Sequence, residues 1–402
     1  MTQFHTFAFR PSSLQALDAM NIDTPTPIQS EAIPPLLEGR DVIGQAYTGS
    51  GKTLAFALPL VEQIDSDEKY LQALVMCPTR ELAQQVGGVL DQLTRGAGIR
   101  TAVVFGGRAI GPQQDEIRAG AQVVVGTPGR ILDLLNRRSM QLDKIKFLVL
   151  DEADQMLDRG FAPDVERILS RTSKSRQTAL FSATTPEWVH GVSAKYLKNP
   201  VVIESEPDLG DEPDIDHVVY EIWGGDKFAV LRRLLDEPTT GSTLIFGRTK
   251  YGVRNLSAKL RRQGYKAGEL QGNLNQQQRD RVLKAFRDGK TPILVATNVA
   301  ARGLDILHIE RVINYELPET HELFTHRVGR TGRMGRSGRA ITLLAAADLP
   351  KWHEIERGLG RKLPRITPDG EAIKPSAAPA RRPRGVRGGR RSYGLGRARA
   401  GR

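Results

Sequence analysis

Short apolar runs recur along the chain, and stretches of helical character separate them. In the first half the runs occupy residues 41–44, 73–77, 101–105, 122–126, 146–150 and 178–182. A second series occupies residues 242–246, 266–270, 292–296, 311–315 and 340–344. Apolar strands that alternate with helices are typical of a parallel sheet with helices on its faces. The pattern therefore predicts an α/β protein in which two such sheets follow one another.

The two series are separated by residues 204–216, which hold seven acidic residues, two prolines and one glycine. This composition resists packing and predicts a linker. From residue 369 onwards the chain is rich in Arg, Gly, Pro and Ala and offers too little apolar surface to fold alone. We therefore expect a first domain at 1–203, a linker at 204–216, a second domain at 217–368 and a disordered tail at 369–402.

Positive charge is concentrated at the C-terminal end. The 402-residue chain has a net charge of +12, and residues 375–402 contain nine arginines and no acidic residue. Subtracting that +9 from +12 leaves +3 for everything before it. We expect the Arg/Gly-rich segment to act as an arm that binds nucleic acid, or, in a plainer interpretation, only to keep the protein in solution.

The sequence also argues against several protein classes. It has no run of about 18 apolar residues, so no membrane span is expected. The N-terminal residues lack an apolar core of signal-peptide length, Cys77 alone cannot form a disulfide within the chain, and no Cys/His cluster suggests zinc. A cytoplasmic protein is therefore expected.

The strongest local signal is AYTGSGKT at residues 46–53, directly after an apolar run. Its glycines allow backbone angles that point N–H groups at phosphate oxygens, and the helix expected next would face the phosphates with its positive end. In this pattern Lys52 reaches the β- and γ-phosphates and Thr53 holds Mg²⁺. A simple Gly/Ser turn explains the glycines but not Lys-Thr at this spacing. The residues assigned to ATP are Ala46, which stands where the general pattern has Gly, Thr48, Gly49, Ser50, Gly51, Lys52 and Thr53.

A second signal, VLDEAD at residues 149–154, ends another apolar run in the same half. Ligand groups of parallel sheets gather at the carboxyl ends of strands, so this segment is expected beside the phosphate loop. Asp151 suits Mg²⁺, through a water, and Glu152 could orient and deprotonate an attacking water. Taken alone, the string could also be a solvated acidic turn.

Nine motifs in a fixed order give the chain a close resemblance to the DEAD-box RNA helicase family, most of all to its compact bacterial members. They are TPTPIQ (24–29), AYTGSGKT (46–53), PTRELA (78–83), GG (106–107), TPGR (127–130), DEAD (151–154), SAT (182–184), ATNVAARGLD (296–305) and HRVGRTGR (326–333). The resemblance covers roughly residues 4–345 and implies two RecA-like domains that close on ATP and RNA.

The resemblance implies further roles around the nucleotide. Gln29 would read the adenine edge, Phe4 would stack on the ring and Asp305 would touch the ribose. Phe4 could instead be a packing residue for the helix that follows it. The residues that couple hydrolysis to domain movement would be Asp154, Ser182 and Thr184.

Arginines of the second domain would complete the ATP site only when the domains close. By the resemblance, Arg330 and Arg333 would be arginine fingers that stabilise charge on the transferring phosphoryl group. Arg327 could serve in the same way or bind RNA phosphate. The whole HRVGRTGR segment could alternatively be a basic loop that binds RNA.

RNA contacts carried over from the family fall on short loops of both domains, whose backbone and hydroxyl groups suit phosphate and sugar rather than bases. Sequence-tolerant binding is therefore expected, and a preference for RNA over DNA is implied by the resemblance. The chain departs from the family at Asn21, Tyr47, Asn298 and the QGN segment at 271–273. The residues expected to contact RNA are Pro78, Thr79, Arg80, Gly107, Thr127, Pro128, Gly129, Arg130 and Thr297.

These features predict an ATP-dependent RNA helicase that uses ATP and Mg²⁺ to separate short RNA duplexes or remodel RNA–protein complexes. Ribosomal or mRNA-decay complexes are candidate partners. Two alternatives stay open: a DNA helicase of the same superfamily, and an ATP-gated clamp that holds RNA without displacing a strand.

Overall fold

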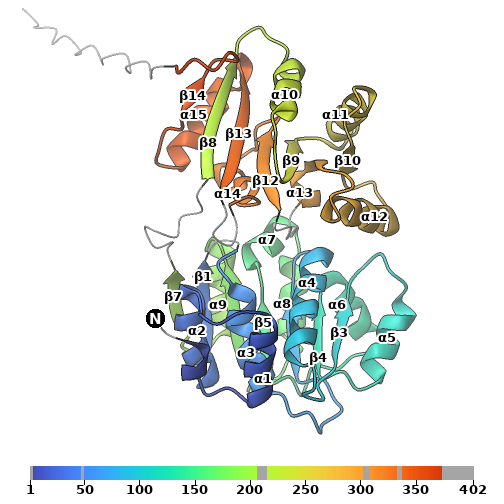
Figure 1. Cartoon of the computed structure of the whole chain (residues 1–402). Helices are drawn as coiled ribbons and strands as arrows, with labels where there is room; N and C mark the ends of the chain where they lie inside the picture. Colours follow the sequence, from blue (N-terminus) through green and yellow to red (C-terminus); the bar gives the residue numbers. More distant parts are fainter. Residues whose placement is uncertain (1–2, 47–48, 206–214, 302–307, 333–336, 374–402) are drawn as a thin grey trace, which may run out of the picture.

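The computed structural model describes residues 3–46, 49–205, 215–301, 308–332 and 337–373. Within these residues the chain forms two seven-stranded parallel sheets, one in each half, with helices packed around them (Figure 1). The expected fold class is confirmed. Three residues with predicted roles, Thr48, Asp305 and Arg333, lie outside the described part of the chain.

The first sheet has the strand order β3-β4-β2-β5-β6-β1-β7. Its central strands β2, β4 and β5 are buried along their whole length, as expected for apolar strands covered by helices on both faces. The strands are β1 (Val42–Ala46), β2 (Ala73–Met76), β3 (Thr101–Val104), β4 (Val123–Gly126), β5 (Phe147–Leu150), β6 (Gln177–Ser182) and β7 (Val201–Ser205).

Side chains on the two faces of this sheet belong to two separate cores. In β2, Val75 packs into one core and Leu74 and Met76 into the other, because successive strand residues point to opposite faces. The elements around the sheet are η1 (Phe4–Thr6), α1 (Pro11–Ala19), α2 (Pro27–Leu37), α3 (Lys52–Gln63), α4 (Arg80–Leu93), α5 (Ile110–Arg118), α6 (Pro128–Asn136), α7 (Ala153–Asp158), α8 (Ala162–Leu169) and α9 (Glu187–Tyr196).

The second sheet repeats the design with the order β10-β11-β9-β12-β13-β8-β14. Its strands are β8 (Ile215–Ile222), β9 (Ser242–Gly247), β10 (Ala267–Leu270), β11 (Ile293–Thr297), β12 (Ile309–Asn314), β13 (Gly338–Ala345) and β14 (Arg365–Ile366). The elements around it are α10 (Lys227–Asp236), α11 (Lys250–Arg262), α12 (Gln276–Arg287), α13 (Asn298–Ala301), α14 (His321–Val328), η2 (Ala346–Asp348) and α15 (Leu349–Gly358).

Three strands were not predicted from the sequence: β7, β8 and β14. All lie at or near a sheet edge, where one side is open to solvent and the residues need not be apolar. The two ends of the segment expected to be a linker are therefore strand residues, since β7 ends at Ser205 and β8 begins at Ile215. Residues 206–214 lie outside the described residues.

The expected start of the disordered tail was also wrong by a few residues. Residues 369–373 continue the fold, because Thr367 N–H donates to Glu371 O and Ile366 pairs with Ala372 in an antiparallel bridge. Gly370, with φ of +92°, allows the tight turn. Residues 374–402, which hold all nine tail arginines, are outside the described residues. Among the described residues, no helix has the length and apolar character needed to cross a membrane.

Candidate functional site

Six of the seven predicted motifs of the first half follow the strands β1 to β6 at their carboxyl ends, and the seventh, TPTPIQ, leads into α2 before β1. Because all the strands run parallel, the motifs meet at one edge of the sheet. Figure 1 shows that this edge, with the short helix α7 upon it, faces the second half of the molecule. The candidate site therefore lies at the carboxyl edge of the first sheet, on the side that faces the second half.

The phosphate loop leads from β1 into α3. Gly49 and Gly51 have φ values of +96° and +93°, a left-handed backbone that residues with a side chain rarely adopt. Lys52 starts the helix, is 7% exposed, and donates from Nζ to the carbonyl of Ala46 at 2.6 Å. The buried Ser50 hydroxyl has no hydrogen-bond partner among the described residues. A cation and an unsatisfied polar group thus line a loop that suits phosphate oxygens.

Gln29 connects the adenine motif to this loop. Its Nε2 donates to Gly51 O at 2.9 Å, and its Oε1 accepts from Thr26 N–H at 2.9 Å at the start of α2. A side chain at Gly51 would collide with the Gln29 amide, so the loop can approach Gln29 only because residue 51 is glycine. The structure therefore places Gln29 beside the nucleotide loop, and its reading of adenine stays a prediction.

Phe4, which the resemblance assigns to stacking on adenine, is buried among neighbouring aromatic rings. Its ring is 2% exposed and packs against Phe7 and Phe9, with ring centroids 6.1 Å and 6.5 Å away. Such a ring has no free face for adenine. The packing alternative therefore describes Phe4 in this structure.

The DEAD segment begins immediately after β5, with both of its first two carboxylates buried. Asp151 is almost inaccessible, and Glu152 adopts a left-handed backbone with φ of +53°, which turns the chain into α7. The Oε2 atom of Glu152 has no partner among the described residues. Strained backbone and an unsatisfied carboxylate oxygen are typical of functional positions. The alternative of a solvated acidic turn is wrong.

Burial and the neighbouring Glu152 carboxylate raise the pKa of Asp151 to about 7, an effect that Lys52 opposes. Among the described residues no group of three or more His, Cys, Asp or Glu side chains could hold a metal by itself. Mg²⁺ normally keeps several waters and takes only one or two carboxylates beside nucleotide phosphates. A single buried carboxylate at the end of β5, with Thr53 in the first turn of α3, therefore fits that ion.

Replacing Asp151 with Asn is expected to stabilise the nucleotide-free protein above neutral pH. The folded state binds the Asp151 proton more tightly than the unfolded chain, so stability falls as pH rises from about 4 through about 7. The difference between the ordinary pKa of 3.8 and about 7 corresponds to at most about 4 kcal/mol. Thermal unfolding at pH 5.5 and 8.5 checks this: Asp151→Asn should raise Tm at both pH values, and clearly more at pH 8.5. An equal effect at both pH values, like that of the exposed control Asp67→Asn, would contradict it.

The predicted coupling residues do meet. The Asp154 carboxylate accepts hydrogen bonds from the Thr184 backbone N–H at 3.1 Å and the Thr184 hydroxyl at 3.0 Å. Ser182 accepts from Asp154 N–H at 3.3 Å and donates to Thr184 O. The ends of β5 and β6 are thereby tied together beside the candidate catalytic carboxylate, and a role of this contact in coupling stays a prediction.

In the second half, Arg327 lies in the last turn of α14 and Arg330 follows the end of that helix. Both side chains are buried. Arg330 is 3% exposed and its Nε donates to His326 O at 3.1 Å. Arg327 donates to Asn298 Oδ1, to Asn314 Oδ1 at 3.0 Å and to Glu316 O at 2.6 Å, and lies over the ring of Phe246. Burial lowers the pKa of Arg327 to about 9. Arg327 therefore holds elements of the second half together, and its role as a finger or an RNA contact stays a prediction.

The predicted RNA contacts of the first half lie on the loops after β2, β3 and β4. Thr79 caps α4 by accepting from Leu82 N–H at 3.0 Å, and Thr127 and Pro128 open α6. Gly107, with φ of +86°, packs against the Arg80 guanidinium so closely that a side chain there would collide with it. The remaining residues of this set are Pro78 before α4, and Gly129 and Arg130 in the first turn of α6. In the second half, Thr297 is the last residue of β11.

Hydrogen bonds and ion pairs of charged side chains join the two halves of the molecule, and the sequence did not reveal them. Arg279 of α12 bonds to Glu81 of α4 and, at 2.6 Å, to Ala300 O in its own half. Arg80 donates to Gln276 of α12. These side chains lie on the helices α4 and α12. The position of motifs at strand ends does not predict that these two helices meet. Two weaker links add to these: Arg108 to Asp280 at 3.4 Å, and Arg159 to Val299 O at 3.0 Å.

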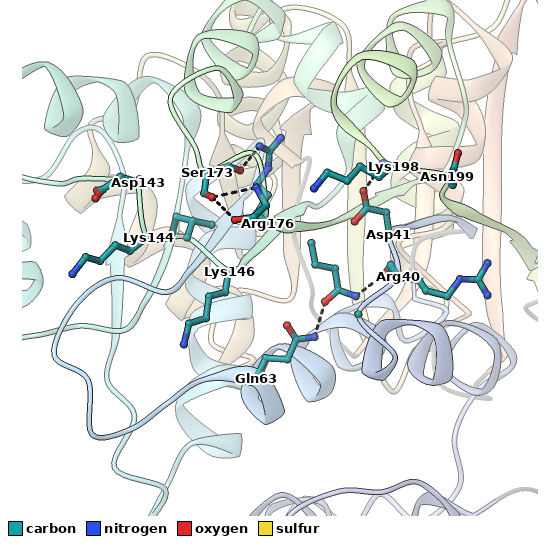
Figure 2. A pocket seen from close by; sticks show the side chains of 14 residues that line it. Arg40, Asp41, Gln63, Asp143, Lys144, Lys146, Ser173, Arg176, Lys198 and Asn199 are labelled. Carbon is teal, nitrogen blue, oxygen red and sulfur yellow. Dashed lines mark hydrogen bonds between the residues drawn. The ribbon is translucent and has the colours of Figure 1, made fainter.

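A separate hollow of about 700 Å³ lies at the opposite, amino edge of the first sheet. Most of its lining residues come from the segments that lead into β1, β5, β6 and β7, and Figure 2 shows Arg176 and Lys198 among them. Its Asp41 carboxylate already accepts from Thr178 N–H at 2.7 Å and Lys198 N–H at 2.6 Å. This hollow contains none of the motif residues, so size alone does not identify the nucleotide site.

Comparison with known proteins agrees with the motif geometry. The model of the DEAD/DEAH box helicase family matches residues 26–192, and the model of the helicase conserved C-terminal domain matches residues 226–335. The DEAD-box ATP-dependent RNA helicase CshA of Bacillus cereus is 40% identical over 366 residues, which are 91% of this chain and 70% of that protein. The ATP-dependent RNA helicase DeaD of Escherichia coli is 41% identical over 366 residues, which are 91% of this chain and 58% of DeaD.

Solved structures resemble both halves together. Saccharomyces cerevisiae Dbp5 bound to RNA and ADP BeF3 is 34% identical, with a TM-score of 0.84 over 92% of this chain and 96% of that one. A DEAD box protein from Methanococcus jannaschii is 37% identical but has a TM-score of only 0.54 over 91% of this chain and 99% of that one. Since the sequence identities are similar, the scores indicate that the two halves are arranged more as in the Dbp5 structure. The chain belongs to the DEAD-box family of ATP-dependent RNA helicases.

Proposed function

We propose that this protein hydrolyses ATP in the cleft between its two halves and uses the closed state to separate short RNA duplexes or to remodel RNA–protein complexes. The observation that carries the proposal is the division of the site. The phosphate loop and the DEAD carboxylates belong to the first sheet, whereas Arg330 belongs to the second. A site divided in this way is complete only when the halves are together, so hydrolysis and domain closure depend on each other.

Each group near the loop has a defined task in this proposal. Gly49, Ser50 and Gly51 cradle the phosphates through backbone N–H groups, and Lys52 exchanges its bond to Ala46 O for phosphate oxygens. Glu152 holds the attacking water and takes its proton, for which its unpartnered Oε2 is available. Gln29 reads adenine from its place beside Gly51. Thr48 and, in the second half, Asp305 would contribute further nucleotide contacts.

Mg²⁺, when bound, would neutralise charge on the phosphates. Asp151 and Thr53 are the residues that would hold it. The raised pKa of Asp151 means that the cation and the proton compete for the same carboxylate.

RNA in this proposal lies across both halves and contacts backbone rather than bases. Arg80 and Gly107, which touch each other, and the Thr127 to Arg130 turn would contact it in the first half, and Thr297 in the second. ATP and RNA then favour the same closed arrangement, so each raises the affinity for the other. The Arg279–Glu81 link and the likeness to the RNA-bound Dbp5 structure support a closed state of this kind. Ribosomal or mRNA-decay complexes remain candidate partners, and a cytoplasmic location remains an expectation.

Strand displacement tests the proposal against its alternatives. A labelled RNA duplex of about ten base pairs with a single-stranded overhang should release its strand with ATP, and far more slowly with a non-hydrolysable analogue. A matched DNA duplex should not respond, since contacts to the 2′-hydroxyl are expected to choose RNA. Tight RNA binding with the analogue but no release with ATP would indicate a clamp. Equal release of the DNA strand would indicate a DNA helicase.

A further inference from the structure

One helix carries much of the positive charge of the folded part of the chain. Residues 248–266, which include all of α11, hold seven Lys and Arg residues and no acidic residue. When this +7 and the +9 of the tail are set aside, the total of +12 leaves −4 for the remainder. The small net charge of the chain before residue 375 therefore includes one strongly basic segment, residues 248–266.

The charge lies on the outer side of α11. Val253, Leu256, Ser257 and Leu260 form the buried side, which packs on the second sheet, as their i, i+3, i+4 and i+7 spacing requires. On the opposite side Arg254 and Arg262 are exposed, and Arg248 and Lys266 are exposed just beyond the two ends of the helix. Within the described part of the chain, the guanidinium groups of Arg248, Arg254 and Arg262 have no ion-pair or hydrogen-bond partner, although the backbone N–H of Arg248 donates to Glu316 Oε2 at 2.6 Å.

The other cations of α11 are engaged. Arg261 donates to Ser257 and to Ala267 O and lies 3.7 Å from Glu269, Lys259 lies over the ring of Phe228, and Lys250 bonds to Asn273. The arginines with unpaired guanidinium groups, Arg248, Arg254 and Arg262, are therefore a subset on the outer side. Together with the exposed Tyr251 we call them the α11 face.

Tyr251 gives the α11 face a feature that charge alone does not. Its side chain is 73% exposed, the largest value among the exposed large hydrophobic residues of the described chain, and it stands in the first turn of the helix between Arg248 and Arg254. An exposed aromatic ring between arginines is the arrangement on which bases of single-stranded nucleic acid stack while phosphates are neutralised.

The α11 face begins where the proposed RNA path ends. Thr297, the predicted RNA contact of the second half, pairs in register with Gly247 of β9, and Arg248 is the next residue. The helix then runs about 20 Å away from that edge, a length of roughly six stacked nucleotides. The last described residues, which end at Ile373 just after β14, lie at the other end of the sheet, since α11 packs on β10, β11 and β9. Figure 1 shows α11 and β14 on opposite sides of the second half.

We propose that the α11 face binds single-stranded RNA that emerges from the cleft, with Tyr251 stacking on a base and Arg248, Arg254 and Arg262 on phosphates. This inference rests on the proposed function. It adds an anchoring surface that is independent of both the cleft and the tail. RNA long enough to leave the cleft should bind more tightly than RNA that only fills it, and the gain should depend on salt.

The test is fluorescence anisotropy on the full chain with two labelled single-stranded RNAs, one of about 8 nucleotides and one about 8 nucleotides longer, the excess exceeding the span of α11. Arg254→Gln/Arg262→Gln should weaken binding of the long RNA about tenfold at low salt and reduce its salt slope by about 1.4. Tyr251→Ala should weaken it at least about fivefold, and Tyr251→Phe should restore it. The short RNA should bind equally well in all variants.

The matched control is Arg95→Gln/Lys174→Gln, which removes the same charge from exposed positions at the amino edge of the first sheet. If the α11 variants bind the long RNA like this control, the inference is wrong. The rate of ATP hydrolysis at saturating short RNA distinguishes a failure of the proposed function from a failure of the α11 inference. A wild-type protein that does not respond to short RNA refutes the proposed function, whereas a normal response together with unaltered long-RNA binding refutes the α11 face alone.

Discussion

Lys52→Ala is expected to reduce ATP hydrolysis by at least about 10³-fold, to or below the limit of detection. Lys52 is the buried cation of the phosphate loop, and among the described residues its ammonium bonds to one backbone carbonyl, Ala46 O. It also opposes the rise in the pKa of Asp151, so its removal would favour the protonated form of that carboxylate. The variant thus loses phosphate contact and metal affinity together.

Steady-state phosphate release, with nucleotide binding measured in parallel, checks this expectation. Lys69→Ala is a suitable control, because Lys69 is an exposed lysine of the same half that bonds to Ser66 O. Thermal unfolding verifies that the Lys52 variant is folded. Full activity of a folded Lys52→Ala protein would rule out the assignment of the phosphate loop.

Arg330→Ala is expected to lower the RNA-stimulated rate by about 10³–10⁵-fold while ATP still binds. The phosphate loop and DEAD carboxylates can hold the nucleotide without the second half. The substitution should therefore slow hydrolysis, which needs the closed state, and leave ATP binding unchanged. Arg330 is nearly inaccessible and bonds to His326 O, so a contact with the phosphoryl group requires its guanidinium to change partners when ATP binds.

Two further variants test why Arg330 is needed. Arg330→Lys distinguishes the charge of the side chain from its planar shape, and Arg357→Ala shows the effect of removing an unrelated arginine. Arg330→Lys keeps the charge but loses the planar fork, and should recover only part of the rate. Arg357 is exposed on α15, and its replacement should change nothing. Single-turnover hydrolysis measures the chemical step directly. If Arg330→Ala hydrolyses ATP at the wild-type rate with RNA, the divided site is wrong. Arg333, outside the described residues, can be examined in the same way.

The nucleotide site could be predicted from the sequence because strand-end geometry is simple. AYTGSGKT and VLDEAD each follow an apolar strand, and parallel strands bring such segments to one edge whatever the details of packing. The meeting of Asp154 with Thr184 was implied only by the family resemblance, and the structure forms it because β5 and β6 are neighbours.

What could not be predicted depends on side-chain environment and on the relation of the two halves. Arg327 stands in a motif rich in arginine, and only the structure reveals that Asn298 and Asn314 bind its guanidinium in the interior. Phe4 has the expected position in the chain but packs against Phe7 and Phe9. The Arg279–Glu81 link joins residues far apart in the sequence, for which no local pattern exists.

The most direct test of the central claim is the rate of ATP hydrolysis with and without RNA. The wild-type protein should hydrolyse ATP slowly alone, much faster with single-stranded RNA, and hardly faster with DNA of the same sequence, whereas Arg330→Ala should show no acceleration with either. A wild-type rate that is equally fast with and without RNA would contradict the claim that RNA and ATP act through one closed state.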